Sequence, residues 1–206
     1  MSKPYNRKDH LYQRAKDEGY RSRAAYKLIE LNQLHRLFRS GERVLDLGCW
    51  PGGWMQVASK AVGPAGIVVG VDLVTIEPLP HQNVRFIEGD ARSEEMLHQL
   101  NSLVPDKFHS VISDMSPKLT GIKEADMAGS VGCAEACLEI AKHLLLPNGS
   151  FVVKLFKSQE SDNFVKAVRP FFEKIKRCEL DSTRSTSNEF YFVGLGWHPP
   201  KTVSAS

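Results

Sequence analysis

Short runs rich in apolar residues alternate with longer segments of helical periodicity through most of the chain. Five runs, at 43–48, 66–73, 83–90, 108–114 and 150–156, are typical of strands buried on both faces of a parallel sheet. Two more, at 174–181 and 188–197, predict a terminal pair of strands. Because helical segments separate the first five runs, right-handed βαβ crossovers are expected. The predicted fold is α/β, a doubly wound, mostly parallel seven-stranded sheet in which the final strand can be antiparallel.

Apolar spacing and end signals also predict the helices. Ser22 is expected to cap the first helix, and Pro51 to open the second at a position that loses no hydrogen bond. Apolar positions that step by four and three from Met127 to Leu145 predict a long helix, which the triplet 147–149 (Pro-Asn-Gly) would stop. The expected helical segments are 23–38, the stretch from Pro51, 93–103, 127–145 and 164–172.

Composition narrows the class of protein. The 206 residues are enough for one domain with one core, and 42% hydrophobic with 25% charged residues is ordinary for a globular chain. No apolar run is long enough to span a membrane and the N-terminus has no signal peptide pattern, so a cytoplasmic protein is expected. The four cysteines do not form a disulfide framework, and Cys133 and Cys137 are interpreted as helix-packing residues because no zinc-site spacing accompanies them. No metal is expected.

Charge is unevenly distributed along the chain. The net charge is +3, yet residues 1–43 hold 11 Lys or Arg against 5 Asp or Glu. A basic arm over 1–21, partly flexible, is therefore expected ahead of a domain over 22–198, with a flexible tail over 199–206. Such an arm fits an anionic polymer, because Lys and Arg displace counterions from phosphates. A solvated basic helix explains the charge equally well.

The glycine-rich turn at 48–53 narrows the choice of ligand. It lacks the lysine of a phosphate-binding P-loop, since Trp54 follows Gly53. It also lacks the GxGxxG spacing of a dinucleotide site, because Trp50 stands where the second glycine is needed. A phosphoryl transferase is therefore disfavoured, and a nicotinamide oxidoreductase is weakened as an alternative.

Acidic residues end three successive predicted strands. Asp46 and Gly48 lie at the end of the first, Asp72 at the end of the second and Asp90 just after the third. S-adenosylmethionine has no phosphates but carries a ribose and an adenine that carboxylates can hydrogen-bond, and open α/β sheets bind ligands at this edge. Each acid taken alone is as well explained as a strand-end turn former. The set of three favours an S-adenosylmethionine site. Asp72 is expected to accept hydrogen bonds from the ribose hydroxyls and Asp90 from the adenine amino group, with backbone groups near Gly52 and Trp54 at the methionine end.

Four further segments carry a family resemblance. "DLGCWPGGW", "SDMSPKLTG", "FVVKLF" and "SNEFYFV", preceded by "RSRAAYKL", resemble the FtsJ/RrmJ (RlmE) ribosomal RNA 2′-O-ribose methyltransferases from about Arg21 to Trp197. The resemblance implies a Rossmann-like, S-adenosylmethionine-dependent fold with an N-terminal basic helical extension. One departure is visible, since Cys49 and Trp50 stand where the family carries two alanines, and this concerns the packing around the methionine tail.

The resemblance also implies site residues. The family's catalytic tetrad matches Lys27, Asp114, Lys154 and Glu189, with Lys154 as the proton acceptor for the ribose hydroxyl. It carries cofactor contacts over to a set of five residues: Gly52, Trp54, Asp72, Asp90 and Asp114. The local sequence also favours a functional role for Lys154, because an ammonium inside an otherwise apolar strand is costly unless it is paired or functional. Whether Lys154 acts as a base or stabilises the developing oxyanion stays open at this point.

The function expected from the resemblance is S-adenosylmethionine-dependent 2′-O-methylation of a uridine in 23S (large-subunit) ribosomal RNA. The expected substrate is the assembled or assembling 50S subunit, and the protein is expected to act as a monomer. Arg21, Arg23 and Lys27 are the expected RNA contacts. A tRNA 2′-O-methyltransferase is the nearest alternative, and a non-catalytic RNA-binding assembly factor is an alternative from another class.

Overall fold

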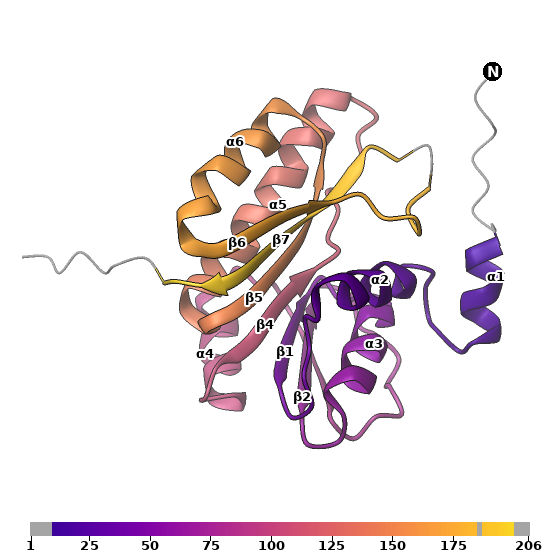
Figure 1. The fold of residues 1–206 in the computed structure, drawn as a ribbon. Helices are drawn as coiled ribbons and strands as arrows, with labels where there is room; N and C mark the ends of the chain where they lie inside the picture. Colours follow the sequence, from indigo (N-terminus) through magenta and orange to yellow (C-terminus); the bar gives the residue numbers. More distant parts are fainter. Residues whose placement is uncertain (1–9, 185–186, 200–206) are drawn as a thin grey trace, which may run out of the picture.

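Seven strands form one sheet in the computed structural model. The structure, drawn in Figure 1, describes residues 10–184 and 187–199. The order of the strands across the sheet is β3-β2-β1-β4-β5-β7-β6. Strands β1 to β5 pair in parallel, whereas β7 lies antiparallel between β5 and β6. The predicted doubly wound, mostly parallel fold is therefore confirmed, including the antiparallel final strand. The strands are β1 Arg43–Leu47, β2 Ile67–Asp72, β3 Val84–Glu88, β4 Phe108–Ser113, β5 Leu145–Phe156, β6 Phe172–Cys178 and β7 Glu189–Trp197.

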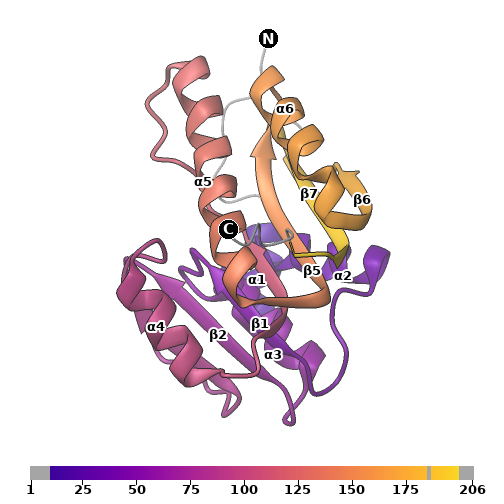
Figure 2. The same ribbon diagram turned by 90° about the vertical axis from the view of Figure 1, so that its left-hand side faces the viewer.

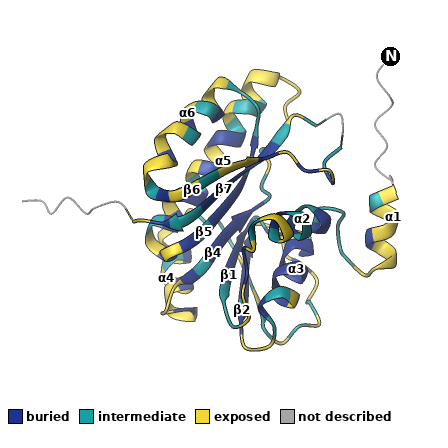
Figure 3. Ribbon diagram, in the orientation of Figure 1, coloured by how far each residue is buried: buried dark blue, intermediate teal, exposed yellow. Residues whose placement is uncertain are grey.

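Helices cover both faces of this sheet (Figure 2). Along β1, Val44 belongs to the core beneath α2 and α3, whereas Leu45 and Leu47 belong to the core beneath α4, α5 and α6. Alternate residues of a strand point to opposite faces, so a strand covered on both sides must be apolar throughout. Figure 3 shows the resulting buried central strands. The helices are α1 His10–Asp17, α2 Ala25–His35, α3 Gly53–Val62, α4 Glu94–Leu103, α5 Lys123–Leu144 and α6 Gln159–Val168.

The starts of α2 and α3 differ from the prediction. Ser22 does not cap α2, which begins at Ala25 without a side-chain cap. Its hydroxyl instead lies against Gly53, 2.5 Å from where a Cβ on that glycine would stand. Pro51 stays in the preceding turn, and Gly52 is the N-cap of α3 with a φ of 103°, which favours glycine. Both predictions were wrong; for Ser22 the reason is the contact with Gly53, which holds its hydroxyl at the start of α3 instead of α2.

The two later helices also differ at their ends. The long helix α5 stops at Leu144, ahead of the 147–149 triplet, which lies within β5. Helix α6 begins at Gln159, earlier than expected, because the side chains of Ser158 and Ser161 form a reciprocal capping box there. The predicted end of α6 at Phe172 is wrong, since a short 3₁₀ turn, Arg169–Phe171, separates the helix from β6.

The N-terminal segment forms helix α1 to the side of the sheet (Figure 1). Only Ala15 of α1 is buried. The Tyr26 hydroxyl donates a hydrogen bond to Glu18 at 3.1 Å, which ties the segment after α1 to α2. The division into an arm over 1–21, a domain over 22–198 and a tail over 199–206 stays a prediction, and residues 1–9 and 200–206 lie outside the described part. No helix among the described residues is long and apolar enough to cross a membrane.

The strand order determines where a ligand can bind. The chain runs outward from β1 through β2 to β3 and then returns to the other side of β1 with β4. This reversal leaves a crevice beyond the carboxyl ends of β1 and β4, where open α/β sheets bind their ligands. The predicted site residues Asp72, Asp90 and Asp114 all lie at this edge.

Candidate active site

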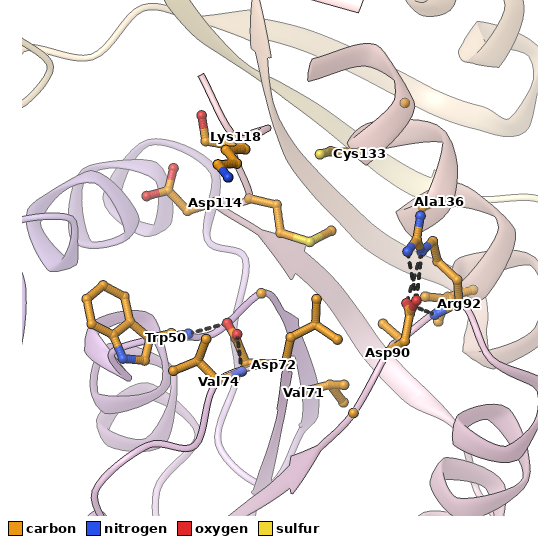
Figure 4. A pocket seen from close by; sticks show the side chains of 18 of the residues that line it. Trp50, Val71, Asp72, Val74, Asp90, Arg92, Asp114, Lys118, Cys133 and Ala136 are labelled. Carbon is orange, nitrogen blue, oxygen red and sulfur yellow. Dashed lines mark hydrogen bonds and ion pairs between the residues drawn. The ribbon is translucent and has the colours of Figure 1, made fainter. Parts of the chain in front are cut away.

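A cavity of about 720 Å³ opens at the carboxyl ends of β1 to β4 (Figure 4). Asp46, Gly52 and Trp54 are not among the residues that line it. Its walls come from the four strand ends and from one face of α5. The lining residues are Gly48, Trp50, Val71, Asp72, Leu73, Val74, Gly89, Asp90, Ala91, Arg92, Asp114, Met115, Ser116, Lys118, Gly129, Gly132, Cys133, Ala136 and Ile140.

Gly48 makes the turn after β1 possible. Its φ is 72°, and a Cβ at this position would stand 2.0 Å from Cγ of Met115. A side chain would be both strained and in collision with the residue that follows Asp114. Gly48 therefore lets the β1 turn and the segment after β4 approach each other at the mouth of the cavity.

Asp72 connects two loops at the cavity wall. One carboxylate oxygen accepts a hydrogen bond from the backbone N–H of Trp50 at 2.8 Å, and the other accepts from Val74 N–H at 2.9 Å. Figure 4 shows both bonds and the carboxylate beside the cavity. Each carboxylate oxygen has a second lone pair. Asp72 is thus held in a fixed orientation and can still accept hydrogen bonds from a ligand.

Asp90 forms a close ion pair with a residue that the sequence did not single out. Arg92 Nη2 lies 2.7 Å from one Asp90 oxygen and Arg92 Nε 2.9 Å from the other (Figure 4). These hydrogen bonds are the main reason that the pKa of Asp90 falls to about 2. The sequence could have indicated this pair, because Arg92 stands only two residues after Asp90, the acidic residue that follows β3.

Asp46 is buried behind the turn. Only 1% of its surface is exposed, and its Oδ2 has no hydrogen-bond partner within the described residues. Burial, and then the negative charges of Asp114 and Asp72, raise the pKa of Asp46 well above its usual value. A protonated carboxyl can donate a hydrogen bond to the turn above it, but this position does not face the cavity.

Gly52 and Trp54 support the turn from its other side. The indole N–H of Trp54 donates to the carbonyl of Ala24 at 2.8 Å, and its ring lies 5.8 Å from that of Tyr191. A Cβ on Gly52 would approach the Arg21 guanidinium at 3.3 Å. The Trp54 side chain is buried, and neither Trp54 nor Gly52 lines the cavity, so their contact with the methionine end of a cofactor stays a prediction.

The four predicted tetrad residues lie together. Lys154 donates to the backbone carbonyl of Asp114 at 2.7 Å, and its Nζ lies 3.2 Å from the Asp114 carboxylate. Lys27 is paired with Glu189, and its Nζ lies 4.0 Å from the same Asp114 oxygen. The exposed fraction of each of these side chains is between 10% and 20%. Two ammonium groups and two carboxylates thus form one compact, mostly buried cluster.

Tyr191 is a fifth member that the sequence reading missed. Its hydroxyl donates a hydrogen bond to Oδ1 of Asp114, and the residue is fully buried. Tyr191 pairs with Lys154 in the register of β5 and β7. Its signal was its position two residues after Glu189, which places both side chains on one face of β7.

Opposing effects act on the Asp114 carboxyl. Burial favours its neutral form, but the positive charges of Lys154 and Lys27, with the hydrogen bond from Tyr191, outweigh burial and lower its pKa. Burial, with the negative charges of Asp114 and Glu189, raises the pKa of the Tyr191 hydroxyl. Asp114 is therefore an anion and Tyr191 a neutral donor at neutral pH.

The two arginines expected to contact RNA are engaged within the chain. The Arg21 guanidinium donates to the carbonyls of Pro51 at 3.2 Å, Glu77 at 2.5 Å and Pro78 at 2.8 Å. Arg23 donates to the carbonyl of Ser182 at 2.6 Å. These bonds hold loops together, so both side chains have a structural use that the charge pattern did not reveal.

The cysteines also have defined places. Cys137 is buried in the core, as expected, whereas Cys133 lines the cavity. Burial raises the pKa of both thiols. Cys49, in the glycine-rich turn, is buried, while its neighbour Trp50 is exposed. No group of three or more His, Cys, Asp or Glu within residues 10–184 and 187–199 is arranged to hold a metal ion.

The residues at the cavity fit S-adenosylmethionine. Asp72 and Asp90 present oriented carboxylates, and the wall between them is apolar, with Val71, Ala91 and Ile140. Carboxylates can accept from ribose hydroxyls and an amino group, and an apolar wall can cover a purine. A Rossmann-like sheet with such a cavity at its switch point and a lysine–carboxylate cluster beside it defines the class of S-adenosylmethionine-dependent methyltransferases.

Comparison with known proteins identifies the family. The FtsJ-like methyltransferase family model matches residues 20–197, and the chain belongs to this family. It is therefore a methyltransferase, and the predicted cofactor is confirmed as S-adenosylmethionine.

Curated relatives extend along most of the chain. A protein of Myxococcus xanthus named ribosomal RNA large subunit methyltransferase E is 40% identical over 206 residues, covering 100% of this chain and 97% of its own length. The protein of the same name from Coxiella burnetii is 41% identical, covering 90% of this chain and 89% of its own.

Solved structures agree with the fold. A Plasmodium falciparum protein described as a ribosomal RNA methyltransferase superposes with a TM-score of 0.77 at 26% identity, covering 86% of this chain and 98% of its own. Fibrillarin of Aeropyrum pernix, with natively bound S-adenosylmethionine, has a TM-score of 0.57 at 15% identity, over 85% of this chain and 75% of its own. The second likeness shows the fold alone.

Proposed function

We propose that this chain methylates the ribose 2′-hydroxyl of a uridine in large-subunit ribosomal RNA, and that its substrate is the assembled or assembling large subunit. The observation that carries the proposal is the contact of Lys154 with Asp114 beside a cavity that fits the cofactor. The names of the curated relatives support the large-subunit RNA as the substrate class.

The reaction needs one proton to be removed. When bound, S-adenosylmethionine supplies a methyl group on a sulfonium. The ribose oxygen forms the new carbon–oxygen bond, the methyl–sulfur bond breaks with its electron pair left on sulfur, and the hydroxyl proton passes to a base. Lys154 is the group proposed to hold that hydroxyl and accept its proton. Positioning and proton transfer are the two contributions that this cluster can make.

Asp114 and its neighbours hold Lys154 in place. Asp114 fixes the Lys154 Nζ through a carbonyl and a carboxylate, and Tyr191 fixes the carboxylate. Lys27 and Glu189 complete the cluster with one charge of each sign. A ribose hydroxyl beside Asp114 would therefore meet a Lys154 Nζ that is held in one position.

RNA contacts are proposed at cationic groups near the cavity mouth. Lys118 lines the cavity on the loop after β4, and Lys27 belongs to the cluster. Arg21 and Arg23 act mainly through their bonds to loop carbonyls. Phosphate contacts of this kind position RNA without reading its sequence.

The test is transfer of labelled methyl groups from S-adenosylmethionine to separated ribosomal subunits, ribosomal RNA and tRNA from cells that lack this protein. Nucleoside analysis then identifies the labelled product. Label in 2′-O-methyluridine from the large subunit is the expected result. Label in tRNA alone would show that tRNA, and not large-subunit RNA, is the substrate. Cofactor binding without label in any pool would favour a non-catalytic RNA-binding factor.

A further inference from the structure

One large aromatic side chain stands exposed at the mouth of the cavity. The chain has three tryptophans, of which Trp54 is 3% and Trp197 0% exposed, whereas Trp50 is 60% exposed. Two neighbours on the cavity wall, Leu73 and Val74, are 66% and 54% exposed. These three residues form an apolar rim, and an exposed apolar patch beside a functional site marks a surface that a ligand covers.

The rim is held firmly by its backbone. The N–H groups of Trp50 and Val74 both donate to the carboxylate of Asp72. Asp72 thus joins the turn after β1 to the loop after β2 and presents the indole on an ordered turn. An aromatic surface fixed in this way loses little conformational freedom when a flat ring stacks on it.

The position of the indole argues against the cofactor's adenine as its partner. Figure 4 shows the Trp50 ring and Asp114 toward one end of the cavity and the Asp90–Arg92 pair at the other. Asp90 is the residue predicted to hold the adenine, so the indole lies at the end away from it. It lies instead on the side of the cavity where the RNA must bring its ribose to the cluster around Asp114.

We propose that Trp50 is a stacking platform for an unpaired nucleobase of the RNA substrate, next to the nucleotide that is methylated. Single-stranded RNA is bound through bases stacked on aromatic side chains, and each stack contributes about 1–3 kcal/mol, or about 5- to 150-fold in affinity. Leu73 and Val74 would widen the apolar surface under that base. The inference rests on the proposed function, because it takes RNA as the substrate.

The first experiment uses Trp50 as its own reporter. Acrylamide should quench mainly the Trp50 fluorescence, because the other two tryptophans are buried. Large-subunit RNA from cells that lack this protein should protect that fluorescence, and S-adenosylmethionine alone should not. The Trp50→Phe variant, which removes the quenchable signal, is the control. Protection by the cofactor alone, or no protection by RNA, would overturn the inference.

The second experiment measures KM for the same large subunits. Trp50→Ala should raise this KM about tenfold, and Trp50→Phe should restore most of the affinity because phenylalanine also offers a ring. In both variants the Kd for S-adenosylmethionine should change less than this KM, and the unfolding temperature should stay unchanged. Leu103→Ala on α4, which removes an exposed apolar residue outside the cavity, is the matched control.

The outcomes separate this inference from the proposed function. If the wild type methylates no RNA pool, the proposed function has failed. The quenching experiment still tests stacking in that case, because it measures RNA binding at Trp50 and not methylation. If methylation proceeds and Trp50→Ala leaves KM unchanged, stacking is wrong and the function stands. If Trp50→Ala raises the cofactor Kd alone, the indole packs on the cofactor.

Discussion

Lys154 contacts Asp114 twice, through the backbone carbonyl at 2.7 Å and through the carboxylate at 3.2 Å. Two contacts from one residue fix both the position of the Nζ and the direction of its remaining N–H. Lys154 reaches the cluster from β5 and Asp114 follows β4, which is the neighbouring parallel strand. The relation therefore depends on the register of two central strands rather than on a loop.

This geometry leads to a prediction for Lys154. Lys154→Ala should lower the rate of methyl transfer by about 10²- to 10⁴-fold, the usual contribution of a positioned proton acceptor. Lys154→Arg should be equally impaired, because a guanidinium keeps the charge but does not deprotonate. Single-turnover transfer to large subunits gives the rates, and calorimetry should find cofactor affinity within about threefold of wild type, since Lys154 does not line the cavity.

The Lys154→Arg variant separates the two roles considered for Lys154. If Lys154 accepts the proton, Lys154→Arg should lose single-turnover transfer, because a guanidinium does not deprotonate. Lys142→Arg, on an exposed surface pair with Glu139, is the control. A Lys154→Arg variant that keeps most of the activity would show instead that the cation stabilises the developing oxyanion.

Asp72 is predicted to bind the ribose of the cofactor and also to hold Trp50 and Val74 of the apolar rim in place. Asp72→Ala should raise the Kd for S-adenosylmethionine by about 10- to 100-fold, because a lost hydrogen bond to a charged group contributes about 1.5–3 kcal/mol. It should also free the N–H groups of Trp50 and Val74, so the acrylamide quenching of Trp50 should change. Asp106→Ala at an exposed site is the control. An unchanged Kd for S-adenosylmethionine would show that Asp72 does not contact the ribose of the cofactor.

Strand patterning and strand ends were predictable, because both follow from local chemistry. Apolar runs located every strand, and parallel strands bring their carboxyl ends to one edge, so Asp72 and Asp90 were expected there. Asp46 was expected with them, but it is buried behind the turn and does not line the cavity. The tetrad needed the family resemblance, since its members are far apart in sequence. Three features, namely the Ser22 contact with Gly53, the Arg21 bonds to loop carbonyls and the Tyr191 bond to Asp114, depend on tertiary packing that no periodicity encodes.

Arg21 is predicted to act on stability more than on RNA binding. Arg21→Gln removes donors to three loop carbonyls and should lower the free energy of unfolding by about 1–3 kcal/mol. The slope of log affinity for RNA against log salt should stay the same, because the guanidinium is engaged within the chain. Arg39→Gln, at an exposed position, is the comparison for both measurements. If the salt slope were smaller in Arg21→Gln but not in Arg39→Gln, Arg21 would contact the RNA after all.

The Asp90–Arg92 pair predicts how stability changes in acid. The folded-state pKa of Asp90, about 2, is below the ordinary value, so ionised Asp90 stabilises the fold at pH above its unfolded pKa of about 3.9. That contribution is lost as pH falls from about 4 toward 2. Arg92→Ala should return the Asp90 pKa toward about 3.9, which a carboxyl-carbon NMR titration measures directly.

Denaturant unfolding at a series of pH values tests the same pair independently. The difference in unfolding free energy between wild type and Arg92→Ala should be small, since the pair is partly exposed, and it should narrow as pH falls through that window. Arg85→Ala should show no such narrowing, because the Arg85 guanidinium donates to the backbone carbonyls of Gln82 and Val84. An Asp90 that titrates near its ordinary pKa in the wild type would show that Arg92 does not pair with this carboxylate in solution.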